Sequence, residues 1–299
     1  MERRYQYYLV DVFTKTRLEG NPLAVFPFPQ GLSDLEMQRI AGELNLSETV
    51  FLSDAAVPAA AAKARIFTPR RELDFAGHPT IGAAYVLALR WAPAGRFAIE
   101  ENVGLVPIER DNDETGNQRF WLTTPKLTFF ETLDATLCAR LLNLSNDDIA
   151  ADAPPQFVSA GSPVLIICLK TTAAVDRAAL QQQYLGDALG SAGSVGTFIF
   201  ARKEPASATC FDVYSRMFAP QTGVPEDPAT GGATGPLAGY MLENGMLPRR
   251  DGLQFTSEQG RKMGRLSFLH VRLGVRSDQT TIEVGGPVVL TGEATLFLD

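Results

Sequence analysis

Arg65-Ile66-Phe67-Thr68-Pro69 returns, about half a chain later, as Arg216-Met217-Phe218-Ala219-Pro220. A Gly/Pro/Thr loop follows each copy and opens an apolar segment rich in Ala and Gly, Gly77-His78-Pro79-Thr80-Ile81-Gly82 in one case and Asp227-Pro228-Ala229-Thr230-Gly231-Gly232 in the other. Upstream of each copy, Gly20-Asn21-Pro22-Leu23-Ala24-Val25 is echoed by Gly161-Ser162-Pro163-Val164-Leu165-Ile166. Because the three pairs run in the same order, the sequence predicts two similar halves with a site between them.

The apolar segments predict two buried helices, at 80–91 and 230–242. Residues 80–91 are apolar almost all round, and a helix without a polar face is buried. Each predicted helix would present an N-terminus, where unpaired N–H groups and the positive end of the helix dipole favour an anion. Two such N-termini facing each other would suit a carboxylate substrate.

The remaining pattern predicts several strands around each helix, and therefore an α+β fold rather than an alternating, doubly wound one. The best boundary is Thr123-Thr124-Pro125-Lys126, which divides the chain into an N-terminal half, 1–124, and a C-terminal half, 125–299. The last strand, about 288–299, could return to the first half. Shorter helices are expected from Ser33 to about Leu44, from Thr132 to Leu142 and from Val175 to Leu185.

The composition favours an enzyme that acts on a small molecule. An apolar content of 45% in 299 residues allows a large core, and a formal net charge of −7 argues against nucleic acid or an anionic membrane as partner. No apolar run approaches the ~18 residues of a membrane span. Three widely spaced cysteines, Cys138, Cys168 and Cys210, predict reduced thiols and a cytoplasmic protein. The two histidines, His78 and His270, form no visible metal-ligand cluster with other residues.

Three side chains could carry chemistry, and each also has an ordinary structural explanation. Glu48 lies where a helix is expected to give way to a strand. It is either a solvated or capping residue or, against an apolar wall, a proton-transfer group with a raised pKa. His78 heads the first buried helix, as an ordered structural residue or as a ligand-facing donor or acceptor. Asp227 precedes a proline, where an N-cap is common, and the nearby Gly231-Gly232 pair implies close approach to the opposite half or to a ligand.

Six motifs follow one another along the whole chain: Val10-Asp11-Val12-Phe13 with Gly20-Asn21-Pro22, Leu46-Ser47-Glu48-Thr49-Val50-Phe51, Phe67-Thr68-Pro69, Glu72-Leu73-Asp74-Phe75-Ala76-Gly77-His78-Pro79-Thr80, Phe218-Ala219-Pro220, and Glu226-Asp227-Pro228-Ala229-Thr230-Gly231. Together they resemble the phenazine-biosynthesis isomerase (PhzF-like) family, which shares the diaminopimelate-epimerase fold. The resemblance implies two pseudo-symmetric halves, each with a sheet wrapped around a central buried helix, and an active site in the cleft between them.

The resemblance also implies which residues form the site. The family's catalytic glutamate, histidine and aspartate fall on Glu48, His78 and Asp227, and substrate contacts are expected at Ser47, Gly77, Thr80, Gly231 and Gly232. Gly232 stands where the family has a serine, so a hydroxyl is lost while the backbone N–H remains for anion binding. The family likeness further implies a homodimer that needs no cofactor or metal.

The same likeness implies the type of reaction. Related epimerases and racemases use two thiols, one on each face of the substrate carbon, but neither loop carries cysteine here, which excludes inversion by a thiol pair. A single carboxyl group, that of Glu48, can instead move a proton between two carbons on one face, which is an allylic proton shift. We therefore expect a cofactor-independent isomerase acting on a small carboxylated substrate that bears an amino or hydroxy group. The alternatives are a non-thiol epimerase of the same fold and a small-molecule-binding homologue without turnover.

Overall fold

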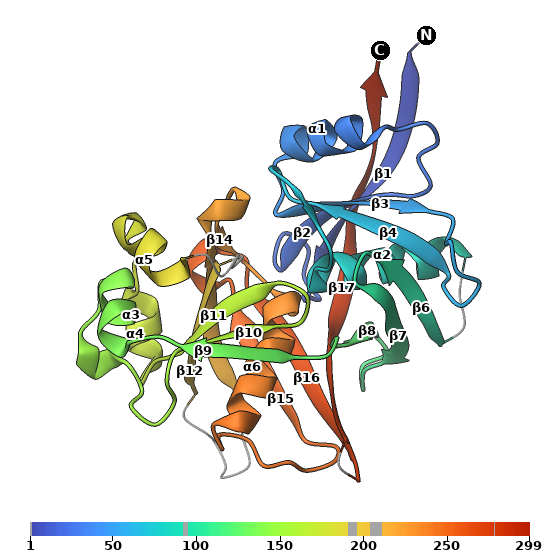
Figure 1. Cartoon of the computed structure of the whole chain (residues 1–299). Coiled ribbons are helices and arrows are strands. Elements are labelled where there is room, and N and C mark those ends of the chain that lie inside the picture. Colours follow the sequence, from blue (N-terminus) through green and yellow to red (C-terminus); the bar gives the residue numbers. More distant parts are fainter. Residues whose placement is uncertain (1, 92–94, 191–195, 204–210, 278) are drawn as a thin grey trace.

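The computed structural model of the protein describes residues 2–91, 95–190, 196–203, 211–277 and 279–299. Its strands are joined by hydrogen bonds into one continuous network. Strand β1 (Arg3–Val12) runs antiparallel to the far end of strand β17 (Gln279–Leu298), so the two termini lie side by side (Figure 1). The first and last segments of the sequence are therefore direct neighbours.

The first half surrounds helix α2 (Gly77–Trp91) with strands. These strands are β2 (Asn21–Phe26), β3 (Glu48–Ser53), β4 (Ala62–Phe67), β5 (Glu72–Leu73), β6 (Arg96–Glu101), β7 (Gly104–Asn112) and β8 (Gln118–Thr123). Helix α1 (Asp34–Leu44) lies outside them (Figure 1). Ser33 caps α1 through a reciprocal bond with Glu36, which confirms the predicted start of this helix.

The second half surrounds helix α6 (Gly231–Glu243) in the same way. Its strands are β9 (Thr128–Thr132), β10 (Gln156–Ser159), β11 (Pro163–Cys168), β12 (Gly196–Arg202), β13 (Val213–Ala219), β14 (Val224–Asp227), β15 (Gln254–Gln259) and β16 (Ser267–Arg276). Three short helices lie at its outer side: α3 (Ala135–Leu141), α4 (Thr172–Arg177) and α5 (Leu185–Leu189).

The echo in the sequence is a repeat in the topology. In the first half, β2 is parallel to β3, β3 is antiparallel to β4, and β4 is parallel to β6. The corresponding strands β11, β12, β13 and β15 repeat these three relationships in order. Even an ion pair is repeated, because Arg65 binds Glu72 at 2.7 Å and Arg216 binds Glu226 at 2.8 Å. The predicted α+β fold with two similar halves is confirmed.

The last strand connects the two halves. Residues 279–287 of β17 pair with β16 and β8, whereas residues 288–298 pair with β1. Strand β9, which directly follows the predicted boundary, pairs with β10. The division into 1–124 and 125–299 as independent units stays a prediction.

Both central helices are buried, with two corrections to the first. Helix α2 begins at Gly77 and not at Thr80, so Pro79 is its third residue. Proline fits there because N–H groups in the first turn have no partner inside the helix. The last turn emerges from the core, since Leu89 is 49% and Trp91 is 50% exposed.

Two other helix predictions in the second half are wrong in part. The helix predicted at 132–142 begins at Ala135, because Asp134 caps it by accepting a bond from the Leu137 amide. Residues up to Thr132 instead extend as β9. The helix predicted at 175–185 is interrupted, because α4 ends at Arg177 and α5 begins only at Leu185.

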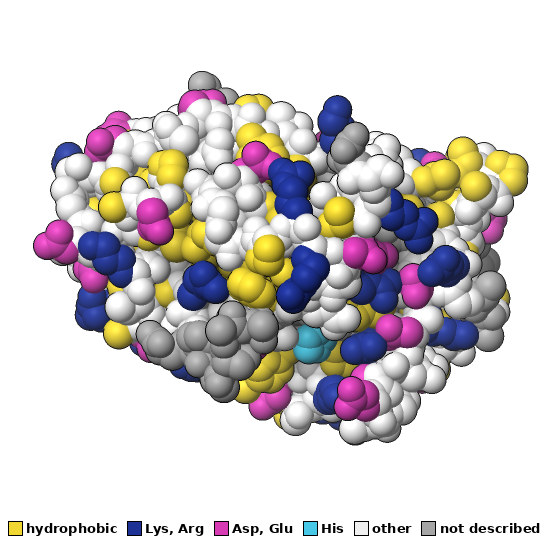
Figure 2. Space-filling model, turned by 90° about the horizontal axis from the view of Figure 1, so that it is seen from below, with side chains coloured by type: hydrophobic (Ala, Val, Ile, Leu, Met, Phe, Trp, Pro, Cys, Tyr) yellow, Lys and Arg dark blue, Asp and Glu magenta, His cyan; other side chains and the backbone are white. Residues whose placement is uncertain are grey.

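The surface mixes charges of both signs. The face seen from below carries basic and acidic side chains next to one another, without a broad patch of one sign (Figure 2). Many of the described charges are paired, for example Arg119 with Asp111 at 2.9 Å and Arg272 with Glu283 at 2.6 Å. No helix within the described residues is long and apolar enough to span a membrane.

Candidate active site

The N-termini of the two central helices meet. A Cβ atom on Gly77 would lie 2.3 Å from the carbonyl carbon of Gly231 and 2.3 Å from the nitrogen of Gly232. Only glycine at position 77 allows the two backbones to approach so closely. The predicted pair of facing N-termini, each able to attract an anion, is therefore present.

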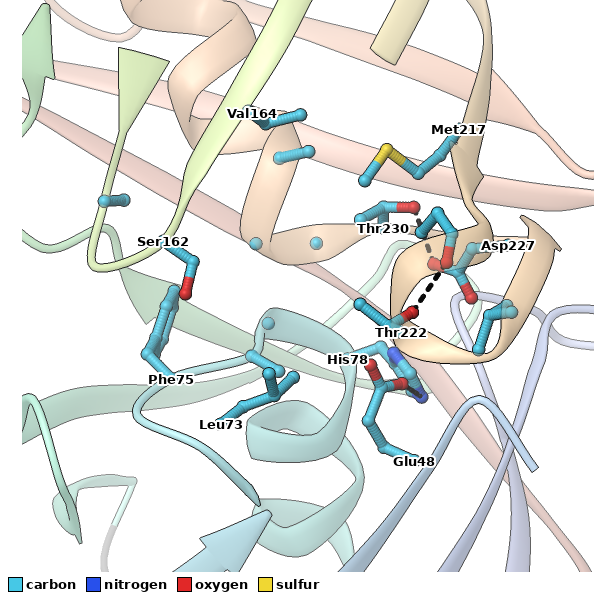
Figure 3. Close-up of a pocket in the computed structure, with 18 residues that line it drawn as sticks. Glu48, Leu73, Phe75, His78, Ser162, Val164, Met217, Thr222, Asp227 and Thr230 are labelled. Carbon is cyan, nitrogen blue, oxygen red and sulfur yellow. Dashed lines mark hydrogen bonds and ion pairs between the residues drawn. The ribbon is translucent and has the colours of Figure 1, made fainter. Parts of the chain in front are cut away.

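A pocket lies at this meeting point, with about 670 Å³ of empty space when its solvent-filled mouth is included (Figure 3). Its apolar wall includes Leu73, Phe75, Val164, Met217 and Val224, and its polar side chains are Glu48, His78, Ser162, Thr222, Asp227 and Thr230. The described residues that line it include neither Lys nor Arg. A negative group on a ligand would therefore have to be met by uncharged donors, which are backbone N–H groups and the side chains of residues such as Ser162, Thr222 and Thr230.

The structure brings Glu48, His78 and Asp227 together from three distant parts of the chain (Figure 3). Glu48 is the first residue of β3, His78 the second of α2, and Asp227 the last of β14. Glu48 Oε2 lies 3.3 Å from His78 Nε2, and the two side chains are only 14% and 3% exposed. Glu48 Oε2 has no hydrogen-bond partner among the described residues. The exposed part of the Glu48 side chain lies in the pocket lining, where a ligand can reach it.

Burial and the neighbouring carboxylate control the acidity of Glu48. Burial is the larger influence and the negative charge of Asp227 adds to it, so the pKa of Glu48 lies well above its usual range. Burial also raises the pKa of Asp227, but hydrogen bonds from Thr230, Ser47 and Asn21 favour its ionised form. Glu48 is therefore the member of the pair that holds a proton more readily.

His78 is neutral and its proton has a defined place. Burial lowers the pKa of His78 to about 3. Asn21 Nδ2 lies 2.9 Å from the carbonyl oxygen of Ala229, which can only accept, so this atom is the amide nitrogen. The same nitrogen lies 3.2 Å from His78 Nδ1 and cannot accept a hydrogen bond, so a proton on Nδ1 would point at a donor, and the lone pair is favoured on Nδ1. The proton of His78 is consequently on Nε2, facing Glu48.

Two side chains that shape this site were not found from the sequence. Asn21 is fully buried at the start of β2, and its Nδ2 also donates to Asp227 Oδ1 at 2.8 Å. Gln259 donates to the backbone oxygen of Asp227 at 2.7 Å and to the hydroxyl of Thr230 at 2.9 Å. Asn21 belongs to a repeated motif, which signals a structural role. Nothing in the sequence marks Gln259.

The other residues expected at the site have different places. Gly77, Gly231 and Gly232 line the pocket. Ser47 is not part of its lining but interacts with Asp227. Thr80 is fully buried behind the pocket, where its hydroxyl contacts Ala76 and Glu101. Substrate contact by these five residues stays a prediction.

The helix-capping explanation considered for Glu48 and Asp227 does not hold. Helix α1 ends in a left-handed Asn45, whose N–H bonds to the Ala41 oxygen, and no described contact links Glu48 to this end. Asp227 lies in β14 and is not an N-cap, since α6 follows Thr230 without any side-chain cap. Neither residue is needed to begin or end a helix.

The two cysteines within the described residues do not line the pocket. Cys138 and Cys168 are free, buried and absent from the lining, and burial raises the pKa of each thiol to about 12. Cys210 lies outside the described residues. Within the described part of the chain, no three His, Cys, Asp or Glu side chains are grouped as metal ligands.

Known proteins resemble this chain from end to end. The sequence model of the phenazine biosynthesis-like family, PhzC-PhzF, matches residues 10–298. An uncharacterized isomerase of Pasteurella multocida is 36% identical over 98% of this chain and 94% of its own length. The trans-2,3-dihydro-3-hydroxyanthranilate isomerase of Pseudomonas chlororaphis is 33% identical over 98% of this chain and 100% of its own.

Solved structures share the fold. A PhzF-family phenazine biosynthesis protein of Bacillus anthracis aligns with a TM-score of 0.87 at 24% identity, over 99% of this chain and 100% of its own. A hydroxyproline epimerase of Agrobacterium vitis aligns with a TM-score of 0.68 at 13% identity, over 99% of this chain and 93% of its own. At these identities both show the fold alone, and they agree with the expected epimerase-like fold. From the sequence matches, the chain belongs to the PhzC-PhzF family of phenazine biosynthesis-like proteins and is an isomerase of that type.

Proposed function

We propose that the chain is a cofactor-independent isomerase that catalyses an allylic proton shift on a small carboxylic acid bearing an amino or hydroxy group. The observation that supports this most directly is the environment of the Glu48 carboxyl group. Its carboxyl group lines the pocket, is mostly buried and has a raised pKa, while its Oε2 lacks a partner among the described residues. Such a group can accept a proton in one step and return it in the next.

In the proposed reaction, Glu48 as a carboxylate removes a proton from a carbon next to a double bond. The electron pair of that C–H bond forms the new double bond, and the π electrons of the original double bond move to its far carbon. Glu48 then protonates the far carbon. His78 presents its Nε2–H beside Glu48, and Asp227, held by Asn21, helps to orient the substrate. The N-termini of α2 and α6 bind the carboxylate.

The arrangement of acids supports a shift on one face over epimerisation without thiols. An epimerase needs groups on both faces of one carbon, but Glu48, His78 and Asp227 lie on one side of the pocket (Figure 3). Ser162, Phe75 and Leu73 lie on another side, and none of them is a base at neutral pH. A small-molecule-binding homologue without turnover is the second candidate, because Gly232 in the pocket lining lacks the hydroxyl of the family's serine.

Exchange of carbon-bound hydrogen with heavy water tests the proposal. Candidates are small amino- or hydroxy-carboxylates, beginning with trans-2,3-dihydro-3-hydroxyanthranilate, the compound that names one relative. We expect deuterium to enter a C–H position of at least one bound candidate, as mass spectrometry would show, with protein-free incubations as control. If a ligand occupies the pocket but none of its C–H hydrogens exchanges, the protein binds small molecules without turnover and the proposed reaction is wrong.

We also propose that the chain forms a homodimer, as the family likeness implies, and that it resides in the cytoplasm. The free thiols of Cys138 and Cys168 fit a reducing compartment. Sedimentation at micromolar concentration should give twice the mass of one chain. A single-chain mass under those conditions would contradict the dimer and leave the proposed chemistry untouched.

A further inference from the structure

Glu101 is a buried carboxyl group for which the proposed reaction has no use. It is the last residue of β6, is 3% exposed and does not line the pocket. Its Oε1 lies 2.5 Å from the hydroxyl of Thr80 in the first turn of α2. That turn also carries Gly77 and His78, which do line the pocket.

The hydrogen bonds around Thr80 determine where the protons are. Thr80 Oγ1 lies 2.7 Å from the backbone oxygen of Ala76 as well as 2.5 Å from Glu101. A hydroxyl has one hydrogen, and in α6 the hydroxyl of Thr234 donates to the backbone oxygen four residues earlier at 2.9 Å, so we assign the hydrogen of Thr80 to the corresponding bond with Ala76. The short contact with Glu101 is then satisfied if Glu101 carries a proton and donates it to Thr80. Glu101 is therefore a neutral carboxylic acid in this arrangement.

The other half of the molecule has a neutral side chain in the same place. Strand β15 pairs with β13 as β6 pairs with β4, so Gln259 corresponds to Glu101. Gln259 ties together the residues before α6, since it bonds to Asp227 and Thr230 and accepts from the Thr230 amide at 3.1 Å. An amide and a protonated carboxyl group have the same shape and can each donate and accept.

We propose that Glu101 is a positioning residue, which as a neutral acid holds the first turn of α2 and on ionisation in alkaline solution weakens anion binding at that turn. The second part rests on the proposed function, which places the substrate carboxylate there. An ionised Glu101 would take the hydroxyl hydrogen of Thr80 away from Ala76. It would also put a negative charge close to the site of the carboxylate.

The surroundings of Glu101 agree with this assignment. Burial raises the pKa of Glu101 to about 8, opposed only by Thr80, whose hydroxyl can donate to the ionised form, and no charged side chain in the described residues contributes. On β6, Glu100 turns toward Lys63 at 3.7 Å; on α2, His78 is neutral; and on β7 the residue opposite is Gly104. The titration of Glu101 is thus separate from other charges.

Carbon-13 labelling of glutamate side-chain carboxyls gives the first test. In the Glu48→Gln protein, one labelled carboxyl should still titrate far above the ordinary range, with a midpoint near pH 8, while in the doubly substituted Glu48→Gln, Glu101→Gln protein that signal is absent. Aspartates are not labelled, so Asp227 does not interfere. If every glutamate of the Glu48→Gln protein titrates in the ordinary range, Glu101 is ionised and the proposal is wrong.

Sulfate, which keeps its charge throughout, serves as the anion probe for the second test. All sulfate titrations in this test use the Glu48→Gln background, because the carboxyl group of Glu48 lines the pocket and also titrates above its usual range. In this background the affinity should fall roughly tenfold from the acidic to the alkaline side of the Glu101 titration. Adding Glu100→Gln should leave the fall unchanged, and adding Glu101→Gln should abolish it. An equal fall after adding Glu101→Gln would overturn the positioning role. If sulfate binds to no variant, the anion site of the proposed function is wrong, while the carbon-13 titration still decides the state of Glu101.

The same titration has a consequence for stability. The folded-state pKa of Glu101 lies above the ordinary value of 4.5, so the folded protein binds this proton more tightly than the unfolded chain. The contribution of Glu101 is complete below pH 4.5 and is lost as the pH rises toward about 8. As the pH rises, melting temperatures should therefore fall more steeply for the wild type than for Glu101→Gln. Parallel curves for the two proteins would count against a protonated Glu101 in the folded state.

Discussion

Turnover is expected to fall by about 10²–10⁴-fold when Glu48 is replaced by glutamine, the usual loss when an enzyme loses its general acid–base residue. Glutamine keeps the size of the side chain and an oxygen that can lie beside His78 Nε2, but it cannot carry a proton between two carbons. Ligand binding should persist, because the N-termini of α2 and α6 supply it independently. The rate of deuterium exchange into a bound substrate and the affinity for that substrate, measured on the same sample, test the two expectations.

The stability of this variant separates a catalytic Glu48 from a structural one. The folded-state pKa of Glu48 is raised, so its contribution to stability is lost as the pH climbs above the ordinary value. Glu48→Gln removes this loss and should be at least as stable as the wild type at neutral pH. A structural residue predicts the reverse, lower stability with intact activity per folded molecule. Glu43→Gln, the same change on the exposed side of α1, is the matched control, and near wild-type C–H exchange in Glu48→Gln would refute the mechanism.

Alanine at position 77 should cost about 3 kcal/mol or more of stability and remove anion binding. The added Cβ would lie 2.3 Å from backbone atoms of both Gly231 and Gly232, and backbone atoms cannot rotate away as a side chain does. The two helices would have to separate, which takes apart the pair of N-termini. Urea unfolding and sulfate titration measure the two effects.

Gly186→Ala is the control for the replacement of glycine itself. Gly186 is exposed in α5, and a Cβ there would meet nothing within 4 Å. Alanine favours helix, so this variant should be unchanged or more stable by up to about 1 kcal/mol. Equal unfolding curves for Gly77→Ala and the wild type would mean that the helices do not meet as closely as described.

The sequence by itself determined the architecture and the principal residues of the pocket. The echo of Arg65–Pro69 in Arg216–Pro220 predicts two similar halves, and the all-apolar character of the segments that follow predicts their buried central helices. Both features are patterns of residue types along the chain, so they can be recognised without knowing the fold. The motifs around Glu48, His78 and Asp227 likewise single out the three side chains that the structure brings into one pocket.

Only the tertiary structure decided how those side chains behave. Asn21 meets His78 because α2 packs against β2, and Gln259 meets Asp227 because β14 and β15 both pair with β13. The second half of β17 joins β1 across nearly the whole sequence. The raised pKa of Glu48 and the neutral state of Glu101 depend on burial and on neighbours from other strands. Proton affinity is set by surroundings that the chain acquires only when distant segments pack together, and no local pattern of residues contains that information.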